Sequence, residues 1–390
     1  MDSGTSERYV SSSNQQCEKH KQNRKPSERF FDTFENHRPQ KPLSSKVTNN
    51  NTEVRSPLVL AIESSCDDTS AAVLRGNQVL SNIVANQAIH HEFGGVVPEL
   101  ASREHQKNIV PVVDRALAKA GINKSDLDAI AFTEGPGLLG SLLVGGSFAK
   151  TFALSLSIPL IAVDHMKAHI LAHFIDEGRP APEFPFLSLT VSGGHTQIVL
   201  VEEPLKMAVI GKTIDDAAGE AFDKAAKILN LGYPGGPMID KLAQEGDASK
   251  FAYATPKTEG LDFSFSGIKT SFLYHLQKEM KSNPEFISDN LNDICASYQN
   301  HLVSYLLSKM ELAISEHNVK DIALAGGVSA NSELRNSFSE LAAKHSIRSH
   351  IPKFEYCTDN AAMIGIVGYF KYLNSDFADF STTPKARLHF

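Results

Sequence analysis

The chain has 390 residues, of which 42% are apolar and 21% are charged, a composition typical of a globular protein with room for two domains. It contains no uninterrupted apolar run of about 18 to 20 residues, and its start lacks the pattern of a signal peptide, which argues against a membrane anchor and against export. The four cysteines form no C-x-x-C pair, so neither a disulfide framework nor a thiolate zinc site is indicated, and a reducing cytoplasmic location is expected.

Residues 1–56 form a polar segment rich in Ser, Asn, Gln, Lys and Arg, and we predict that this tail is disordered because it offers too little apolar area to offset the entropy of ordering. The tail holds 10 of the 38 basic and 7 of the 45 acidic residues. So many acidic residues are unusual in an organellar transit peptide, which makes a mitochondrial location less favoured. The remaining 28 basic and 38 acidic residues make the rest of the chain acidic, so an RNA substrate would need a local basic patch or a partner protein.

After the tail, a strand–turn–strand pattern occurs twice. The first copy runs from a strand at Leu58 to Glu63 through a polar turn to a strand at Ser70 to Leu74. The second runs from Phe186 to Val191 through Ser192-Gly193-Gly194-His195 and returns from Thr196 to Val201. Two similar halves predict two α/β lobes that face each other across a cleft.

Later in each half, an apolar strand runs into glycines and then a helix. These segments are Ala129 to Thr133 before Gly135-Pro136-Gly137, and Asp321 to Ala325 before Gly326-Gly327. A single glycine turn is usually only a tight turn. Four turns in duplicated order, three of them with glycines and some beside helix N-termini, predict a cradle for a phosphate group. The sequence matches neither the P-loop nor the dinucleotide-binding motif.

A pair of histidines, His165 and His169, follows an apolar strand at Leu160 to Val163. At four-residue spacing they share one helix face, so both imidazoles are expected to reach one metal ion. The alternative is that they are ordinary core or solvated histidines, and His173, one turn further, fits either description. Met166 stands where a zinc peptidase of the H-E-x-x-H type has its glutamate base, which argues against proteolysis.

Two histidines rarely suffice to hold a metal ion, so a carboxylate from elsewhere should complete the site. Asp359 is the candidate, because it lies just before a helix expected to run towards Tyr372. Capping of that helix by the Asp359 side chain is the alternative, and the two roles are compatible.

Over about residues 57 to 373 the chain resembles the universal tRNA N6-adenosine threonylcarbamoyltransferase family, formerly called glycoproteases, and is most similar to bacterial members. Several motifs carry this resemblance in the same order along the chain. They are IESSCDDT at 62–69, GGVVPELASR at 94–103, GPG at 135–137, HMKAH at 165–169, SGGHT at 192–196, GEAFDK at 219–224, YPGGP at 233–237, GGVSAN at 326–331 and the segment around Asp359.

The resemblance implies an α/β chain with an actin-like, Hsp70-like and sugar-kinase-like fold, in which two duplicated ribonuclease-H-like lobes flank a central cleft. We expect an N-terminal lobe at residues 57–180 and a C-terminal lobe at residues 181–358. Residues 359–390 are expected to form a C-terminal helix and tail that pack back on the N-terminal lobe.

The resemblance also implies one divalent metal ion, iron or zinc with Fe2+ favoured, held by His165, His169 and Asp359. It assigns the substrate contacts to Thr190, Val191, Ser192, Gly193, Gly194, Asp223, Gly236, Asp240 and Asn331. Thr190 stands where an apolar residue is usual, and a contact through its backbone would be unaffected.

The local pattern leaves other roles open for three of these contacts: Asp223 could pair with Lys227, Asp240 could be a first-turn helix acid and Asn331 could cap a helix. As a set, two carboxylates and an amide beside glycine turns suit the hydroxyl groups of a ribose and the edge of an adenine.

The implied reaction transfers a threonylcarbamoyl group from threonylcarbamoyl-AMP to N6 of the adenosine 3′ of the anticodon in tRNA, forming threonylcarbamoyladenosine and AMP. A bacterial member would work with a paralogous partner of the same fold and a small ATPase, whereas organellar members act as homodimers; no membrane is involved. No general base can be named from the sequence. The alternatives are an ATPase or kinase of the same fold, which would not need the paired histidines, a metallopeptidase, and a non-catalytic scaffold.

Overall fold

The computed structural model describes residues 55–388, and the predicted disordered tail therefore lies almost entirely outside the described residues. Ten strands in this part of the chain form two five-stranded sheets, with orders β3-β2-β1-β4-β5 and β10-β9-β6-β7-β8. The first sheet contains β1 (Leu58–Glu63), β2 (Thr69–Arg75), β3 (Gln78–Ala85), β4 (Ala129–Gly135) and β5 (Leu160–Asp164). The second contains β6 (Phe186–Val191), β7 (Thr196–Glu203), β8 (Lys206–Lys212), β9 (Asp321–Ala325) and β10 (Arg348–His350).

The two sheets have the same topology. In the first, β1 pairs antiparallel with β2 and parallel with β4, and β4 pairs parallel with β5. In the second, β6 pairs antiparallel with β7 and parallel with β9, and β9 pairs parallel with β10. The repeated strand–turn–strand pattern in the sequence is therefore a structural duplication, as expected.

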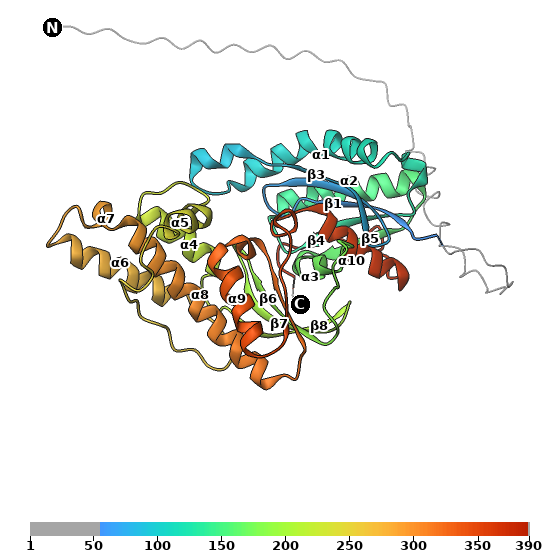
Figure 1. Cartoon of the computed structure of the whole chain (residues 1–390). Coiled ribbons are helices and arrows are strands. Elements are labelled where there is room, and N and C mark those ends of the chain that lie inside the picture. The colour runs from blue at the N-terminus through green and yellow to red at the C-terminus, as the bar shows by residue number, and fades with distance from the viewer. Residues whose placement is uncertain (1–54, 389–390) are drawn as a thin grey trace, which may run out of the picture. The chain divides into compact units, whose positions relative to one another are not determined.

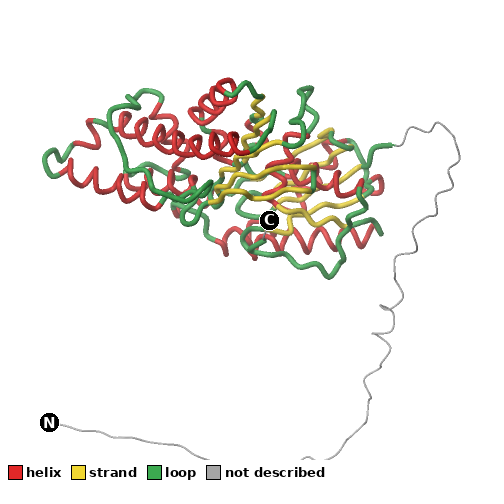
Figure 2. The backbone as a smooth tube through the Cα atoms, turned by 90° about the horizontal axis from the view of Figure 1, so that it is seen from below, coloured by secondary structure: helices red, strands yellow, loops and turns green. Residues whose placement is uncertain are grey.

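Helices lie on both sides of the strands (Figure 2). In the described part of the chain they are α1 (Pro98–Ala120), α2 (Leu139–Leu156), α3 (His165–Leu171), α4 (Ala218–Ile228), α5 (Gly235–Ala243), α6 (Ser266–Met280), α7 (Phe286–Asp289), α8 (Leu291–Glu316), α9 (Ser332–Lys344) and α10 (Ala361–Leu373) (Figure 1).

The two faces of the first sheet pack against different helices. Alternate residues of a strand point to opposite faces. Leu58, Leu60 and Ile62 of β1 pack in one core with residues of α1 and α2, whereas Val59 and Ala61 pack in another with α10 and α3. By the same alternation Glu63, the last residue of β1, faces the side of α3 and α10.

Helix α3 lies between the two sheets. It contacts β4 and β5 of the first sheet and β6 and β9 of the second. Its residue Ile170 joins a small core with Phe186 and Val199 on one face of the second sheet. The opposite face of that sheet packs against α4, α6, α8 and α9 in the largest core. The short helix that carries the paired histidines is therefore fixed at the junction of the two sheets.

Helix α2 is long and apolar enough to cross a bilayer by length and composition. One such helix in the described part of the chain is only weak evidence for a membrane span. Lys150 and Thr151 interrupt its apolar sequence. In this structure it packs against α1 and β4.

The segment after α10 returns along the first sheet. The amide of Ala378 donates to the carbonyl of Leu160. Further on, the amide of Lys385 donates to the carbonyl of Glu134, and the amide of Gly137 donates to that of Ala386. These bonds fasten the C-terminal segment to the glycine turn between β4 and α2.

Candidate metal centre and cleft

The paired histidines both lie in α3, a helix that starts directly after β5. The carboxylate of Asp164 caps this helix, because its Oδ1 accepts hydrogen bonds from the amides of Met166 (2.8 Å) and Lys167 (3.1 Å). The cap fixes His165 as the first residue of α3 and places His169 one turn later. Their ring centroids are 4.7 Å apart, with the rings edge to face.

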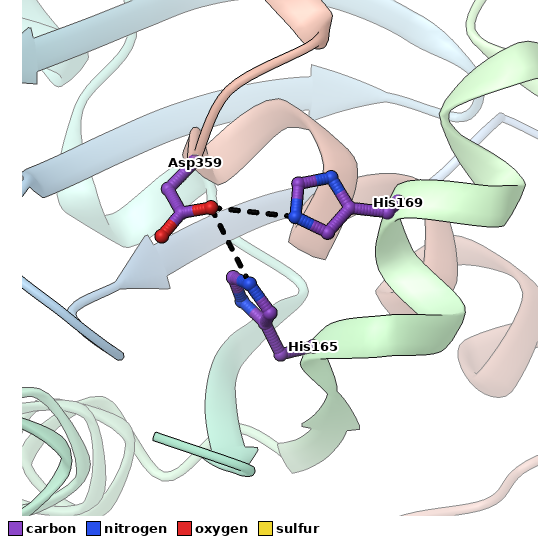
Figure 3. A group of neighbouring side chains, drawn as sticks. All are labelled: His165, His169 and Asp359. Atoms are coloured by element: carbon purple, nitrogen blue, oxygen red, sulfur yellow. Dashed lines mark ion pairs between the residues drawn. The ribbon is translucent and has the colours of Figure 1, made fainter. Parts of the chain in front are cut away.

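Asp359 approaches the same point from the segment before α10. Its Oδ1 lies 3.4 Å from Nε2 of His165 and 3.3 Å from Nε2 of His169, and the three side chains point towards one another (Figure 3). The residue that caps α10 is Asn360, whose side chain accepts from the amide of Met363. The capping alternative for Asp359 is therefore wrong, and its carboxylate is free to face the histidines.

The geometry of the three side chains fits a metal ion. Neither ring nitrogen of His169 has a hydrogen-bond partner among the described residues, although both are buried. Ligand atoms about 2.1 Å from a tetrahedral metal ion lie about 3.4 Å from one another. The separations of 3.3 and 3.4 Å match this spacing, and two imidazoles with one carboxylate are a common donor set for iron and zinc.

Charges around the two histidines differ. Burial alone would lower the pKa of His165, but the carboxylates of Glu63 and Asp359 raise it well above its ordinary value. Burial lowers the pKa of His169, and the neighbouring His165 adds to this effect. Burial would raise the pKa of Asp359, but the two histidines outweigh burial and hold it well below its usual range. The ionised carboxylate and the neutral imidazole of His169 are the forms in which these groups bind metals.

His173, the third histidine of this stretch, is not part of the group. Its Nε2–H donates to the carbonyl of Leu324 in β9 at 2.9 Å. Burial lowers the pKa of His173 to about 4, so the ring is neutral near pH 7. The side chain is a hydrogen-bonded link between the lobes.

A cleft with a volume of about 470 Å³ extends from Asp359 between the lobes. Asp67 and Asp68, in the turn after β1, line one side. Most other lining residues belong to the second half of the chain: Ser192, Gly193, Gly219, Phe222, Asp223, Tyr233, Pro234, Gly236, Pro237, Asp240, Lys241, Gln244, Gly327, Val328, Ala330, Asn331 and Thr358. Asp359 therefore belongs both to the histidine group and to the cleft wall.

The expected substrate contacts fall into two groups. Six of them line the cleft: Ser192, Gly193, Asp223, Gly236, Asp240 and Asn331. Gly194 lies in the same turn as Gly193 but does not line the cleft. Thr190 and Val191 are fully buried in β6, so the structure does not bring these two side chains to the cleft wall.

The local alternatives for Asp223 and Asp240 are wrong. Oδ1 of Asp223 accepts from the amide of Gly235 at 2.7 Å and so anchors the start of α5, instead of pairing with Lys227. The glycines and proline of the motif at 233–237 lead directly into α5, whose first turn contains Pro237 because no intrahelical donor is needed there. Asp240 lies beyond this turn.

Asp240 and Asn331 meet at the start of α9. Asp240 accepts from the amide of Ser332, and its Oδ1 also accepts from the Ser332 hydroxyl at 2.6 Å. Asn331 caps α9 by accepting from the amide of Leu334, which confirms the capping alternative, and its Nδ2 donates to Oε1 of Gln299. Both residues still line the cleft, so capping and a ligand contact are compatible.

Helix α4 starts close to the turn after β6. A Cβ added at Gly219 would lie 2.6 Å from the carbonyl oxygen of Ser192, and only glycine permits this approach. The N-termini of α4 and α9 both lie at the cleft, and most of their first amides already have partners. Those of Ala218 and Gly219 donate to Thr196 and Ser192, and those of Ser332 and Leu334 donate to Asp240 and Asn331.

Sequence reasoning counted the acidic turn after β1 among the four turns of the expected phosphate cradle but named none of its residues as a substrate contact. Burial, followed by the charges of Asp67 and Asp359, raises the pKa of Asp68 to about 7. Burial and the same acidic neighbours raise the pKa of the Cys66 thiol well above its ordinary value, so it stays protonated and is a poor nucleophile. The motif at residues 62–69 marked this turn as important, but its place in the same cleft as Asp223 depends on the tertiary fold.

The sequence comparisons agree with one another. Residues 78–366 match the family model described as "tRNA N6-adenosine threonylcarbamoyltransferase". A protein of this name from Christiangramia forsetii is 61% identical over 333 residues, which are 85% of this chain and 98% of that protein. Another of this name, from Riemerella anatipestifer, is 58% identical over 335 residues, covering 86% of this chain and 98% of that protein.

A comparison with solved structures identifies the fold. The crystal structure of full-length HypF in the phosphate- and nucleotide-bound form matches with a TM-score of 0.54 at 13% identity, over 83% of this chain and 48% of that chain. The similarity to HypF and the duplicated sheets together show the actin-like, Hsp70-like and sugar-kinase-like fold, as expected.

Proposed function

This chain belongs to the tRNA N6-adenosine threonylcarbamoyltransferase family and is a transferase that modifies tRNA, and we propose how its cleft performs the reaction. The reaction transfers the threonylcarbamoyl group of threonylcarbamoyl-AMP to N6 of the adenosine 3′ of the anticodon and releases AMP. The observation that carries the proposal is the position of Asp359, which faces both histidines and also lines the cleft. A metal ion held there would lie at the end of the adenylate site.

We propose that His165, His169 and Asp359 hold one divalent metal ion, and that this ion is Fe2+. Two histidines and one carboxylate that leave coordination positions open are typical of non-haem iron sites, and the same donors also hold zinc. When bound, the ion supplies a Lewis acid that polarises and orients the carbonyl of the threonylcarbamoyl group.

The adenylate is proposed to occupy the cleft. The turn at Ser192 and Gly193 lines the cleft beside the N-terminus of α4, where the positive end of the helix dipole favours the phosphate. Asp223 and Asp240 supply carboxylate oxygens for the ribose hydroxyls, and a carboxylate has about four acceptor sites, so the bonds they already make leave some free.

These residues promote transfer mainly by positioning the reactants. The lone pair on N6 of adenosine forms a bond to the carbonyl carbon, the bond from that carbon to the phosphate oxygen breaks, AMP leaves with the electron pair, and N6 loses a proton. The amine is a poor nucleophile because its lone pair is delocalised into the ring. Holding both reactants in near-attack geometry can contribute about 7 to 11 kcal/mol. A base in the anticodon loop is able to unstack and enter a pocket.

The test is a direct assay of transfer. Purified chain is incubated with threonylcarbamoyl-AMP and unmodified tRNA, with and without candidate partner proteins, and the nucleosides are analysed by mass spectrometry. We expect threonylcarbamoyladenosine from the unaltered chain, and a loss of at least about 100-fold in His169→Ala and Asp359→Ala, as is usual when a residue that stabilises the transition state is removed. Undiminished product from both variants would remove the metal from the mechanism, and steady ATP hydrolysis without transfer would favour an ATPase.

We also propose that the chain works with protein partners: a paralogous chain of the same fold and a small ATPase, or a second copy of itself. Leu139, Leu143 and Leu154 share one face of α2 and are 49%, 46% and 62% exposed, and Val110 on the adjacent α1 is 60% exposed. An exposed apolar face of this kind marks a protein interface. A partner would also supply the basic surface for tRNA that this acidic chain lacks in its overall charge.

A further inference from the structure

Glu63 is a buried carboxylate whose surroundings offer it hydrogen-bond donors from three directions. It ends β1, and its side chain is fully buried. Oε1 accepts from the amide of Ser65, and Oε2 accepts from the hydroxyl of Thr133 at 2.7 Å. Oε2 also lies 3.0 Å from Nδ1 of His165. A charge buried so completely is costly unless it is paired and hydrogen-bonded, as this one is.

The fold explains why Glu63 reaches His165. Val59 and Ala61 of β1 point to the core under α10 and α3, and Glu63 continues this alternation. Thr133 stands beside Glu63 on β4, since the parallel register pairs Ile62 with Phe132. The two side chains thus lie together at the strand ends, directly beneath the first residue of α3.

The two histidines differ in the groups that lie next to their Nδ1 atoms. Nδ1 of His165 faces Glu63, while its Nε2 faces Asp359. Nδ1 of His169 is buried without a hydrogen-bond partner among the described residues. A carboxylate behind a metal-binding histidine fixes the proton on the nitrogen that faces it, and thereby leaves the other nitrogen free for the metal.

We propose that Glu63 is a positioning residue that holds His165 with its proton on Nδ1 and its Nε2 lone pair aimed at the metal ion. This inference rests on the metal centre proposed above. It deepens that proposal by adding a residue that touches neither metal nor substrate and acts through His165.

The geometry also predicts that glutamine in place of Glu63 should fail to hold His165 in this way. Glutamine has nearly the same shape as glutamate, but its amide nitrogen is a donor. Placed at the Oε1 position, that nitrogen would face the amide of Ser65, and placed at the Oε2 position it would face the N–H of His165. In the second case the His165 proton is driven to Nε2, the nitrogen that must bind the metal. The site therefore needs a hydrogen-bond acceptor at both the Oε1 and the Oε2 position of residue 63.

The experiment measures metal binding without any assay of transfer. Metal-free full-length chain is titrated with Co2+ and with Zn2+ against a chromophoric chelator, and the visible absorption of bound Co2+ is recorded. We expect Glu63→Gln to lose about 10- to 100-fold in metal affinity and to change the Co2+ spectrum. His169→Ala should lose binding altogether.

The matched control is Asp321→Asn, the same carboxylate-to-amide change in the second sheet. Asp321 is also fully buried and accepts bonds from Arg348 and His350, far from the histidine pair in sequence. Whatever it does to the melting temperature, Asp321→Asn should bind metal with unchanged affinity. An equal loss in Asp321→Asn and Glu63→Gln would overturn the inference, because the effect would then be a general one of disturbing a buried carboxylate.

A second measurement needs no variant. In the zinc-loaded chain with 15N-labelled histidines, NMR distinguishes a ring nitrogen that carries hydrogen from one bound to metal. We expect His165 to carry its proton on Nδ1 and to bind through Nε2; binding through Nδ1 would overturn the inference. If the unaltered chain binds metal and His169→Ala does not, but Glu63→Gln binds normally, this inference fails while the metal centre stands. If the unaltered chain binds no metal, both fail.

Discussion

Removal of one metal ligand should abolish the stabilisation that metal gives to the folded chain. A ligand that binds only the folded state, present at about 100 times its dissociation constant, adds about 2.7 kcal/mol to the free energy of unfolding. Residues 55–388 comprise 334 positions, and at about 2.1 cal/mol/K each their unfolding entropy is about 0.7 kcal/mol/K. Metal should therefore raise the melting temperature of the unaltered chain by about 4 °C, and that of His169→Ala by less than about 1 °C.

The comparison must be made within each variant. His169 is 2% exposed, so its truncation leaves a cavity that costs about 2 to 5 kcal/mol with or without metal. Because this cost is the same with and without metal, it does not affect the change in melting temperature that metal produces within one variant. His173→Ala is the matched control, because it also truncates a histidine on the next turn, but one whose Nε2 bonds to Leu324. Scanning calorimetry of each chain in chelator and in excess Zn2+ gives the shifts. A full shift in His169→Ala, or its loss in His173→Ala, would refute the reasoning.

Two further predictions concern the turn after β1. A Cβ at Gly137 would lie 2.4 Å from the carbonyl oxygen of Ser65, whose hydroxyl is 3.2 Å from Nδ1 of His165. Gly137→Ala should therefore lower the free energy of unfolding by about 1 to 3 kcal/mol and weaken metal binding. Gly232→Ala is the control and should do neither, because a Cβ at Gly232 meets open space. Because burial and nearby carboxylates raise the pKa of Asp68 from 3.8 to about 7, the folded chain binds this proton more tightly than the unfolded chain, and stability is lost as pH rises across that window. Asp68→Asn should therefore melt higher than the unaltered metal-free chain at pH 8 and lose most of this advantage towards pH 4; an advantage that is constant or largest at low pH would contradict the assignment.

The sequence predicted the strands and the histidine group well because both depend on local patterns. Leu58–Glu63, Phe186–Val191 and Asp321–Ala325 have the bounds expected from their apolar runs. His165 and His169 meet because helical spacing alone brings them to one face. Asp359 was named because a carboxylate ligand was needed, and the resemblance implied the same residue, but nothing local states that the segment before α10 crosses to α3.

Roles that depend on partners distant in sequence were missed or misread. Asp240 reads locally as a helix acid, but its bonds go to Ser332, 92 residues away. Glu63 reads as the end of an apolar strand, and its contact with His165 spans 102 residues. A charged residue at the end of a fully buried strand is the one local signal that could have marked Glu63, because such a charge needs a partner.

The duplication also explains how the chemistry is divided between the lobes. Glu63 ends β1 and Thr133 lies beside it, two residues before the end of β4, whereas Val191 and Ala325 end the equivalent strands β6 and β9. At this edge the first sheet therefore carries polar side chains, one of which contacts His165, and the second carries apolar side chains followed by glycine turns. Glu63 of the first sheet contacts His165, and most of the cleft wall belongs to the second half of the chain. If the adenylate occupies the cleft as proposed, the carbonyl to be attacked lies where the histidine group meets the cleft wall, at Asp359.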